Sequence, residues 1–166
     1  MSIDIGLAKR ARQGYHFDDI SIVPSRRTRD PEEVSTHWQI DAYRFDLPII
    51  AAPMDSVMSP ETAIALGRFG GLGVLDLEGL WTRYEDPTPL LAEIASVDAS
   101  QVTGRLQEIY SEPIKAGLIT ERLQQMRDAG VTVAASLSPG QTKRFAETVM
   151  KTGVDLFVIR GTTVSA

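Results

Sequence analysis

The sequence contains no cysteine and only two histidines, His16 and His37, among its 166 residues. Without cysteine the chain forms no disulfide, offers no thiolate ligand to zinc and carries no thiol nucleophile. Both histidines lie near the N-terminus, which disfavours a histidine-based catalytic triad or metal cluster. We therefore predict no catalytic residue and no metal site within this chain.

An excess of positive charge is also missing. The 22 acidic residues outnumber the 17 lysines and arginines, giving a net charge of −5 and an isoelectric point near 5.0. Proteins that bind a nucleic-acid backbone normally show a basic face, so no nucleic-acid partner is expected. No apolar run approaches the roughly 20 residues of a membrane span, and the N-terminus lacks a secretory apolar segment. We expect a cytoplasmic location and no membrane partner.

What the sequence does contain is a series of short apolar segments. Such segments, apolar on both faces and bounded by Pro or Gly, are typical of parallel strands buried on both sides. They predict strands at 47–51, 72–76, 131–137 and 155–160.

Helix signals lie between these segments. Ser59-Pro60 predicts an N-terminus and Gly70-Gly71 the end of the same helix. Ser138-Pro139 and Gly153 bound another helix in the same way. Between them the pattern predicts helices over 88–96, over 99–111 after Asp98, and over 120–128 with Thr120 as its cap.

The N-terminal part, 1–46, is predicted to be an arm and extended segment separate from the strands of 47–166. Residues 3–14 mix apolar and basic side chains at loosely helical spacing, which indicates a short helix or a mobile arm. Residues 15–36 look extended and irregular. The cluster Arg26, Arg27 and Arg29 has two interpretations, a phosphate contact or a solvated basic turn, since acidic residues follow at once.

The order strand, helix, strand, helices, strand, helix, strand implies parallel strands joined by crossovers. An open doubly wound sheet and part of a (β/α)₈ barrel both satisfy this order. After the first strand comes APMDSVM, residues 52–58, and not a glycine-rich dinucleotide motif. A complete barrel takes about 250 residues. We therefore expect the N-terminal half of a (β/α)₈ TIM barrel, truncated in its fourth strand-to-helix loop; the alternative is a complete flavodoxin-like domain.

Two stretches resemble the IMP dehydrogenase/GMP reductase family. These are FDDISIVPSRRTR, from Phe17, and LPIIAAPMDSVMSPETAIALGRFGGLGVL, from Leu47. AGVTVAASL and TGVDLFVIR resemble the next two barrel strands of the family. The resemblance covers nearly the whole chain and is weaker from 76 to 125.

The resemblance implies a (β/α)₈ barrel, usually tetrameric, that interconverts purine nucleotides (IMP, GMP or XMP) with NAD or NADP(H). It allows a monovalent cation in the complete protein. Ala52 and Met54 match the positions beside the nucleotide. Arg160, Gly161, Thr162 and Thr163 match the segment on the nicotinamide side. Judged from the residue alone, Met54 also fits a purely structural role, as a side chain that fills the open end of the barrel.

Three features depart from the family pattern. The segment 76–130 is too short for the regulatory CBS modules, so the chain resembles the CBS-less branch. Arg160 stands where the family usually has Asp. Arginine is suited to recognising phosphate or carboxylate groups, and an equal alternative is that Arg160 turns toward a local acidic partner. The family's catalytic cysteine belongs to the loop after strand six, beyond residue 166, so the chain as given is expected to be inactive.

Three functions remain open at this point. The first is a purine-nucleotide oxidoreductase, of which this chain is part. The second is a non-catalytic nucleotide-binding relative with an assembly or regulatory role, which the exchange at Arg160 favours. The third is a phosphate-binding barrel with other chemistry, against which Met54 argues weakly.

Overall fold

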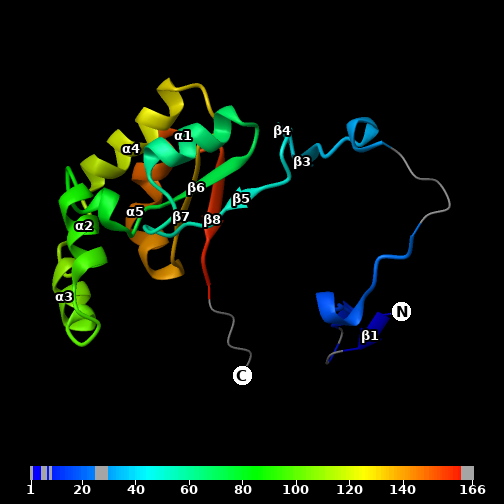
Figure 1. The fold of residues 1–166 in the computed structure, drawn as a ribbon, viewed down its shortest axis with the longest axis horizontal. Coiled ribbons are helices and arrows are strands. Elements are labelled where there is room, and N and C mark those ends of the chain that lie inside the picture. The colour runs from blue at the N-terminus through cyan, green and yellow to red at the C-terminus, as the bar shows by residue number, and fades with distance from the viewer. Residues whose placement is uncertain (1, 5–6, 8, 25–29, 162–166) are drawn as a thin grey trace. The chain divides into compact units, whose positions relative to one another are not determined.

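A computed structural model describes residues 2–4, 7, 9–24 and 30–161 of the chain. It divides the chain into two compact units, Met1–Ser35 and Thr36–Ala166 (Figure 1). The predicted segment 1–46 therefore includes residues 36–46, which belong to the same unit as the sheet.

The first unit contains a short antiparallel pair of strands. Strand β1 (Ser2–Asp4) pairs with β2 (Arg10–Arg12), so of the two alternatives for 3–14 the short helix is wrong. Two 3₁₀ turns, Phe17–Asp19 and Pro31–Glu33, interrupt the extended segment 15–36. Arg26, Arg27 and Arg29 lie outside the described residues.

The second unit is built on a four-stranded parallel sheet. Its strands are β5 (Ile50–Ala51), β6 (Leu72–Asp76), β7 (Ala134–Leu137) and β8 (Leu156–Ile159). They lie in the order β5-β6-β7-β8, so each strand pairs with the next one along the chain. A doubly wound sheet reverses its strand order, whereas consecutive parallel neighbours are the arrangement of a (β/α)₈ barrel. The predicted half barrel is confirmed.

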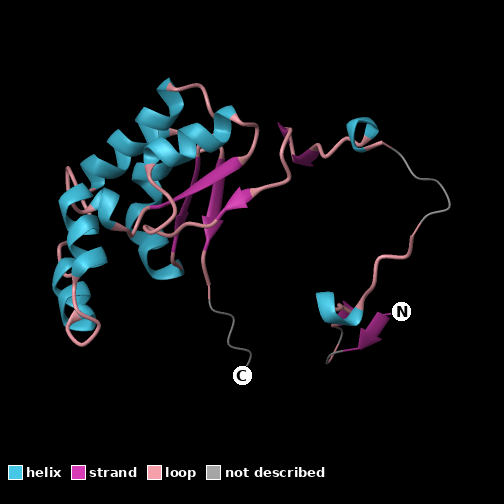
Figure 2. Cartoon of the chain, in the orientation of Figure 1, coloured by secondary structure: helices cyan, strands magenta, loops and turns pink. Residues whose placement is uncertain are grey.

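Helices cover one face of this sheet (Figure 2). They are α1 (Pro60–Arg68), α4 (Ala116–Asp128) and α5 (Pro139–Thr152), which pack against one another in chain order. A turn of 3₁₀ helix (Leu80–Thr82) follows β6. After it come α2 (Thr88–Ser96) and α3 (Val102–Ile109), which form a hairpin at the lower left of Figure 1.

The predicted helix ends are confirmed at α1 and α5. The Ser59 and Ser138 hydroxyls accept hydrogen bonds from the backbone amides of Thr62 and Gln141. At the other end of α5, Gly153 has a φ of 85°, a left-handed conformation that glycine adopts without strain.

Two other predicted caps are wrong. Helix α4 begins at Ala116, and Thr120 lies inside it with its hydroxyl 3.3 Å from the Ala116 carbonyl. Asp98 accepts hydrogen bonds from Ser100 and so holds the turn before α3, which starts at Val102. Both side chains found a local backbone or side-chain partner that a cap pattern does not distinguish from a helix start.

Side chains alternate strictly across the sheet. Leu75, Ala135 and Leu137 point toward the helices and are fully buried in the main core. Gly73 also faces the helices, where a Cβ would overlap the backbone of Ala63 in α1. This close approach of strand and helix requires glycine. The sheet therefore packs against α1, α4 and α5 through small and aliphatic residues.

The inner face of the sheet has a second, smaller core at the amino ends of its strands. The antiparallel hairpin of β3 (Trp38–Ile40) and β4 (Tyr43–Phe45) packs its apolar side chains into this core. Phe45 is 4% exposed and stacks on Trp38 at 4.6 Å between ring centroids. The Tyr43 hydroxyl donates to Asp155 just before β8. The hairpin thus closes the amino end of the half barrel and leaves the carboxyl ends of the strands free.

Candidate functional site

A cavity of about 370 Å³ lies at the carboxyl ends of the strands. The loop after β5 contributes to its wall, as do the last residue of β6, the residue after β8 and the α2–α3 hairpin. The lining residues are Pro53, Met54, Asp55, Ser56, Asp76, Leu91, Ile94, Leu106, Tyr110 and Arg160. Barrel enzymes carry their active sites at this end of the strands, because the loops that follow them converge there.

The loop after β5 brings Met54 to the cavity. A tight turn, with the Met54 amide 2.9 Å from the Ala52 carbonyl, ends the strand and turns the chain. Met54 is 52% exposed, so its thioether is accessible rather than packed in the core. Ala52 is exposed one step before the lining residues. The structure thus brings Met54 to the cavity, with Ala52 beside it.

Arg160 and Asp76 form an ion pair between the carboxyl ends of β8 and β6, the two strands that flank β7. The Arg160 Nη2 lies 2.7 Å from the Asp76 Oδ1 and 3.8 Å from the Glu78 Oε1. Both occupy inner-face positions, because Ser136 on β7 pairs with Asp76 on one side and with Val158 on the other, and Arg160 comes two residues after Val158. Arg160 therefore has the local acidic partner that was one of its two interpretations, and it also lines the cavity.

Burial raises the pKa of Asp76 above its ordinary value of 3.8. The Glu78 amide and the Arg160 guanidinium oppose this shift by favouring the charged carboxylate. Beside Asp76 in register, the hydroxyl of fully buried Ser136 has no hydrogen-bond partner among the residues that the structure describes. The inner face is therefore polar where the strands end, in contrast to its apolar beginning.

Asp55 joins the first strand end to the α2–α3 hairpin. Its Oδ2 accepts hydrogen bonds from the Leu80 amide at 2.8 Å and from the Tyr110 hydroxyl at 2.6 Å. Gly79 lies so close that a Cβ there would overlap the Asp55 carboxylate. Burial, together with the hydrogen bond to Asp55, raises the pKa of Tyr110 above its ordinary value of 10.0. Tyr110 therefore keeps its proton at neutral pH.

The α2–α3 hairpin is held rigidly against the loop after β6. Arg105 binds Glu93 through two hydrogen bonds of 2.5 and 3.0 Å, which joins α3 to α2. Arg83 donates to the Tyr110 carbonyl at 2.9 Å, and the Tyr84 hydroxyl donates to the Ile109 carbonyl at 2.8 Å. These bonds fix the position of the hairpin's cavity-facing side chains.

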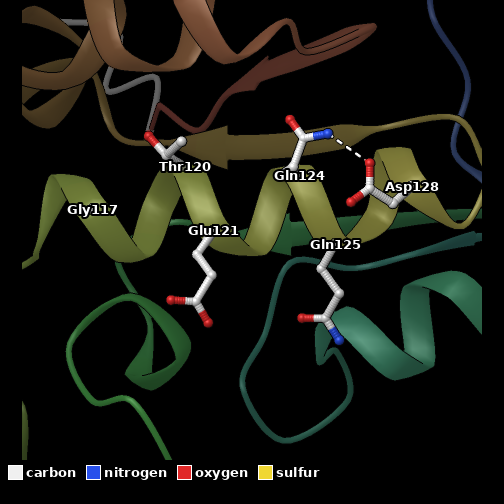
Figure 3. A pocket seen from close by; sticks show the side chains of 6 residues that line it. All are labelled: Gly117, Thr120, Glu121, Gln124, Gln125 and Asp128. Atoms are coloured by element: carbon white, nitrogen blue, oxygen red, sulfur yellow. Dashed lines mark hydrogen bonds between the residues drawn. The ribbon is translucent and has the colours of Figure 1, made fainter.

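A larger hollow of about 600 Å³ lies elsewhere, on α4 (Figure 3). All its lining residues come from that one helix. Figure 3 shows Thr120 and Gln124 on one side of the helix and Glu121 and Gln125 on the other, with Gln124 bonded to Asp128. Gln125 also donates to Glu61 at the start of α1. These polar groups have partners within the helical layer, so the hollow is a surface groove away from the strand ends.

The sequence predicted part of the cavity and missed part of it. Met54 and Arg160 were predicted and line it, whereas Gly161 is exposed just beyond β8 and is not among the lining residues. Thr162 and Thr163 lie outside the described residues. Asp55 and Asp76 were not assigned to the site, although Asp55 follows the predicted strand 47–51 and Asp76 ends the predicted strand 72–76; these positions were a usable signal. Nothing in the sequence pointed to Tyr110.

Two negative findings complete the description. Within the described ranges, no three or more His, Asp or Glu side chains gather in a way that would hold a metal ion. No helix among the described residues has both the length and the apolar character needed to cross a membrane.

The fold and this cavity define a class of protein: a parallel (β/α) barrel type with its site at the carboxyl ends of the strands. The IMP dehydrogenase / GMP reductase domain matches residues 14–164 of the chain. The chain belongs to the IMP dehydrogenase/GMP reductase family.

Similar proteins support this assignment. An uncharacterized oxidoreductase of Mycolicibacterium smegmatis is 43% identical over 169 residues, which cover 99% of this chain and 45% of that protein. One from Mycobacterium tuberculosis is 44% identical with the same coverage. An inosine-5'-monophosphate dehydrogenase of Methanocaldococcus jannaschii is 38% identical over 65 residues, covering 39% of this chain and 13% of that protein.

A solved structure agrees along the whole chain. The crystal structure of an IMP dehydrogenase/GMP reductase-like protein from Corynebacterium glutamicum matches with a TM-score of 0.83 and 43% identity. The match covers 99% of this chain and 45% of that one. The chain thus spans a little under half the length of the Mycolicibacterium, Mycobacterium and Corynebacterium relatives, in keeping with its four consecutive barrel strands.

Proposed function

We propose that the protein is a purine-nucleotide oxidoreductase of the IMP dehydrogenase/GMP reductase type. This chain would supply the part of the nucleotide and cofactor sites that the first four barrel strands form. The observation that carries the proposal is the strand-end cavity, because Met54 and Arg160, two residues singled out in the sequence for different parts of the site, line the same space. The substrate is IMP, GMP or XMP.

In this proposal Met54 lies against the purine base. Its thioether is polarizable and unbranched, and it is half exposed at the cavity rather than packed in the core. The cavity also has apolar groups from Leu91, Ile94 and Leu106, which suit a flat ring system. Ala52 contributes backbone beside the same base.

The cofactor side is assigned to Arg160 and Gly161, with Thr162 and Thr163 included on the resemblance alone. NAD or NADP(H) would supply hydride transfer. The Arg160 guanidinium fits the phosphate groups of such a cofactor, since it is a planar, permanently charged donor that reaches the cavity. Binding there competes with the Asp76 carboxylate, which holds the same guanidinium at 2.7 Å.

The remaining parts of the proposal follow the family. We place the protein in the cytoplasm, as a homo-tetramer without nucleic-acid or membrane partners, and allow a monovalent cation in the complete protein. A chain without cysteine cannot supply the thiol that the resemblance implies, so residues 1–166 alone should give no turnover with IMP plus NAD or with GMP plus NADPH.

The test of the nucleotide site is Met54→Ala in the full-length protein, with IMP and GMP titrated by calorimetry. The proposal predicts weaker binding of at least one nucleotide, because the contact surface for the base is lost. Met150→Ala is the matched control, since Met150 is 72% exposed and lies on α5. Equal affinities for all three proteins would overturn the assignment of Met54.

The test of the cofactor side is Arg160→Gln. Glutamine removes the positive charge but keeps an N–H donor for Asp76. An aspartate at this position would instead place a second carboxylate beside that of Asp76. A charged contact is worth about 1.5–3 kcal/mol, roughly ten- to a hundredfold in affinity. If Arg160 contacts a cofactor phosphate, NAD, NADH, NADP and NADPH affinities measured side by side fall by up to that factor. Arg144→Gln, on exposed α5 surface, is the control.

A second candidate function is a non-catalytic nucleotide-binding relative with an assembly or regulatory role. The observation in its favour is that Arg160 is already engaged by Asp76 and lies 3.8 Å from Glu78. Assays of the full-length protein with IMP plus NAD and with GMP plus NADPH distinguish the two functions. Turnover in either direction excludes the second; nucleotide binding without turnover favours it.

A further inference from the structure

Tyr110 is the cavity residue for which the geometry suggests a specific task. It follows α3 in the long segment that joins β6 to α4, and it reaches the cavity because the α2–α3 hairpin folds over that space. Tyr110 is 37% exposed, and its backbone carbonyl accepts a hydrogen bond from Arg83 at 2.9 Å. The Arg83 guanidinium also lies over the Tyr110 ring, 5.7 Å from its centre. The ring is therefore both fixed in position and accessible.

The hydroxyl proton of Tyr110 has a defined direction. It points to the Asp55 Oδ2 at 2.6 Å, and the Leu80 amide fixes that carboxylate from the main chain. Gly79 leaves no space for Asp55 to shift toward it. A phenol has one proton to donate, so once this proton is given to Asp55 its oxygen offers only lone pairs to a second partner. Tyr110 thus presents a hydrogen-bond acceptor to the cavity.

The surroundings of this acceptor suit the edge of a heteroaromatic ring. Leu91, Ile94 and Leu106 line the cavity from the hairpin, and Met54 lines it from the loop after β5. A ring lying against these apolar groups exposes its polar groups at its rim, where a fixed acceptor discriminates between N–H donors and carbonyl oxygens. Oxopurines carry such N–H groups on the ring and, in GMP, an exocyclic amino group.

We propose that Tyr110 is a specificity-determining residue of the nucleotide site, whose oxygen, oriented by Asp55, accepts a hydrogen bond from an N–H group of the bound purine. The proposal rests on the proposed function, because it requires the base to lie in the strand-end cavity. It assigns the α2–α3 hairpin a part in substrate recognition, although the hairpin belongs to no barrel strand.

The experiment compares Tyr110→Phe with Tyr84→Phe in the full-length protein. Both changes remove one hydroxyl, and the Tyr84 hydroxyl donates to the Ile109 carbonyl at the end of the same helix without lining the cavity. GMP and IMP affinities are measured for each protein, together with melting temperatures. The two variants should lose similar stability, so a difference in affinity reports on the cavity.

The expected result is a loss of about two- to tenfold in affinity for GMP, IMP or both in Tyr110→Phe, with no change in Tyr84→Phe. A loss confined to GMP assigns the bond to the exocyclic amino group, and an equal loss for both assigns it to a ring N–H. Equal affinities in the two variants, or parallel losses in both, overturn the role of Tyr110.

The wild-type titration separates this inference from the proposed function. If the wild-type protein binds neither GMP nor IMP, the proposed function fails and the role of Tyr110 fails with it. If the wild-type protein binds and Met54→Ala weakens binding while Tyr110→Phe does not, only the role of Tyr110 is overturned.

Discussion

The two ends of the parallel strands differ sharply in chemistry. At the amino ends the inner face is closed by the β3–β4 hairpin, and Phe45, Leu72 and Val74 are buried with apolar neighbours. At the carboxyl ends the same face carries Asp76 and, just beyond β8, Arg160, next to a cavity. One sheet therefore combines an apolar end that stabilises it with a polar end that can bind.

Substitutions at the two ends of the strands should therefore affect different properties of the protein. Apolar burial contributes to the free energy of unfolding roughly in proportion to the area removed from water. Largely buried charges such as Asp76 contribute little to stability or oppose folding, and perturbed charges of this kind cluster at functional sites. Changes at the amino ends should alter stability, whereas changes at the carboxyl ends should alter binding and pH dependence.

The largest effect is expected at the amino ends. Phe45→Ala removes a ring that is 4% exposed and stacked on Trp38, so it should lower the free energy of unfolding by about 3–5 kcal/mol. Denaturant unfolding measures this loss. Phe69→Ala is the control, because Phe69 is 74% exposed, and should change stability by less than about 0.5 kcal/mol. Similar losses of stability in both variants would contradict the conclusion that the β3–β4 hairpin closes the amino end of the sheet with a buried apolar core.

An intermediate effect is expected at the junction of the strand end and the hairpin. In Gly79→Ala the new Cβ overlaps Asp55, which must move away from Leu80 and Tyr110. We expect the free energy of unfolding, measured by thermal or denaturant unfolding, to fall by about 1–3 kcal/mol. Gly104→Ala should instead be neutral or stabilising by up to about 1 kcal/mol, since Gly104 lies inside α3 with open space around it. A stable Gly79→Ala protein would show that Asp55 is not confined.

The smallest effect is a pH dependence at the carboxyl ends. The folded-state pKa of Asp76 is raised, so the folded protein binds its proton more tightly than the unfolded chain does. Asp76 therefore lowers stability progressively as pH rises above the ordinary value of 3.8. Removing the carboxyl group in Asp76→Asn should make the variant's stability, relative to wild type, increase with pH from that point.

Asp98→Asn provides the opposite slope. Hydrogen bonds from Ser100 lower the pKa of Asp98, so its stabilising contribution is present above the ordinary carboxyl pKa and is lost as pH falls through the folded value. Relative to wild type, this variant should become less stable as pH rises. Unfolding measured from pH 3 to pH 7 compares the two slopes, and slopes of the same sign would contradict the environment assigned to Asp76.

Much of the fold could be predicted because its signals are local. The strand at 72–76 and the helix at 88–96 were predicted with the bounds that the structure shows. Serine caps and left-handed glycine depend on a few neighbouring residues, so Ser59 and Gly153 could be predicted directly. Thr120 could not, because a threonine inside a helix and one at its start look alike until the preceding turn is known.

The residues of the candidate site also separate into those that local sequence predicts and those that it does not. Met54 and Arg160 follow strands, and a parallel sheet brings the residues after its strands to one edge, so the sequence and its family resemblance were sufficient to predict them. Tyr110 is 55 residues from the Asp55 it binds, and it reaches the cavity only because two helices fold back over it. No local pattern encodes such a contact.

By itself, then, the sequence determined the order of the strands and helices of the second unit, the helix ends marked by Ser59, Ser138 and Gly153, and the residues that leave the sheet at its carboxyl edge, because each depends on neighbours along the chain. Only the tertiary structure decided that the strands lie in consecutive order, that Arg160 pairs with Asp76, and that the α2–α3 hairpin carries Tyr110 to the cavity. These are contacts between distant residues, and they arise from packing and charge pairing that exist only once the chain has folded.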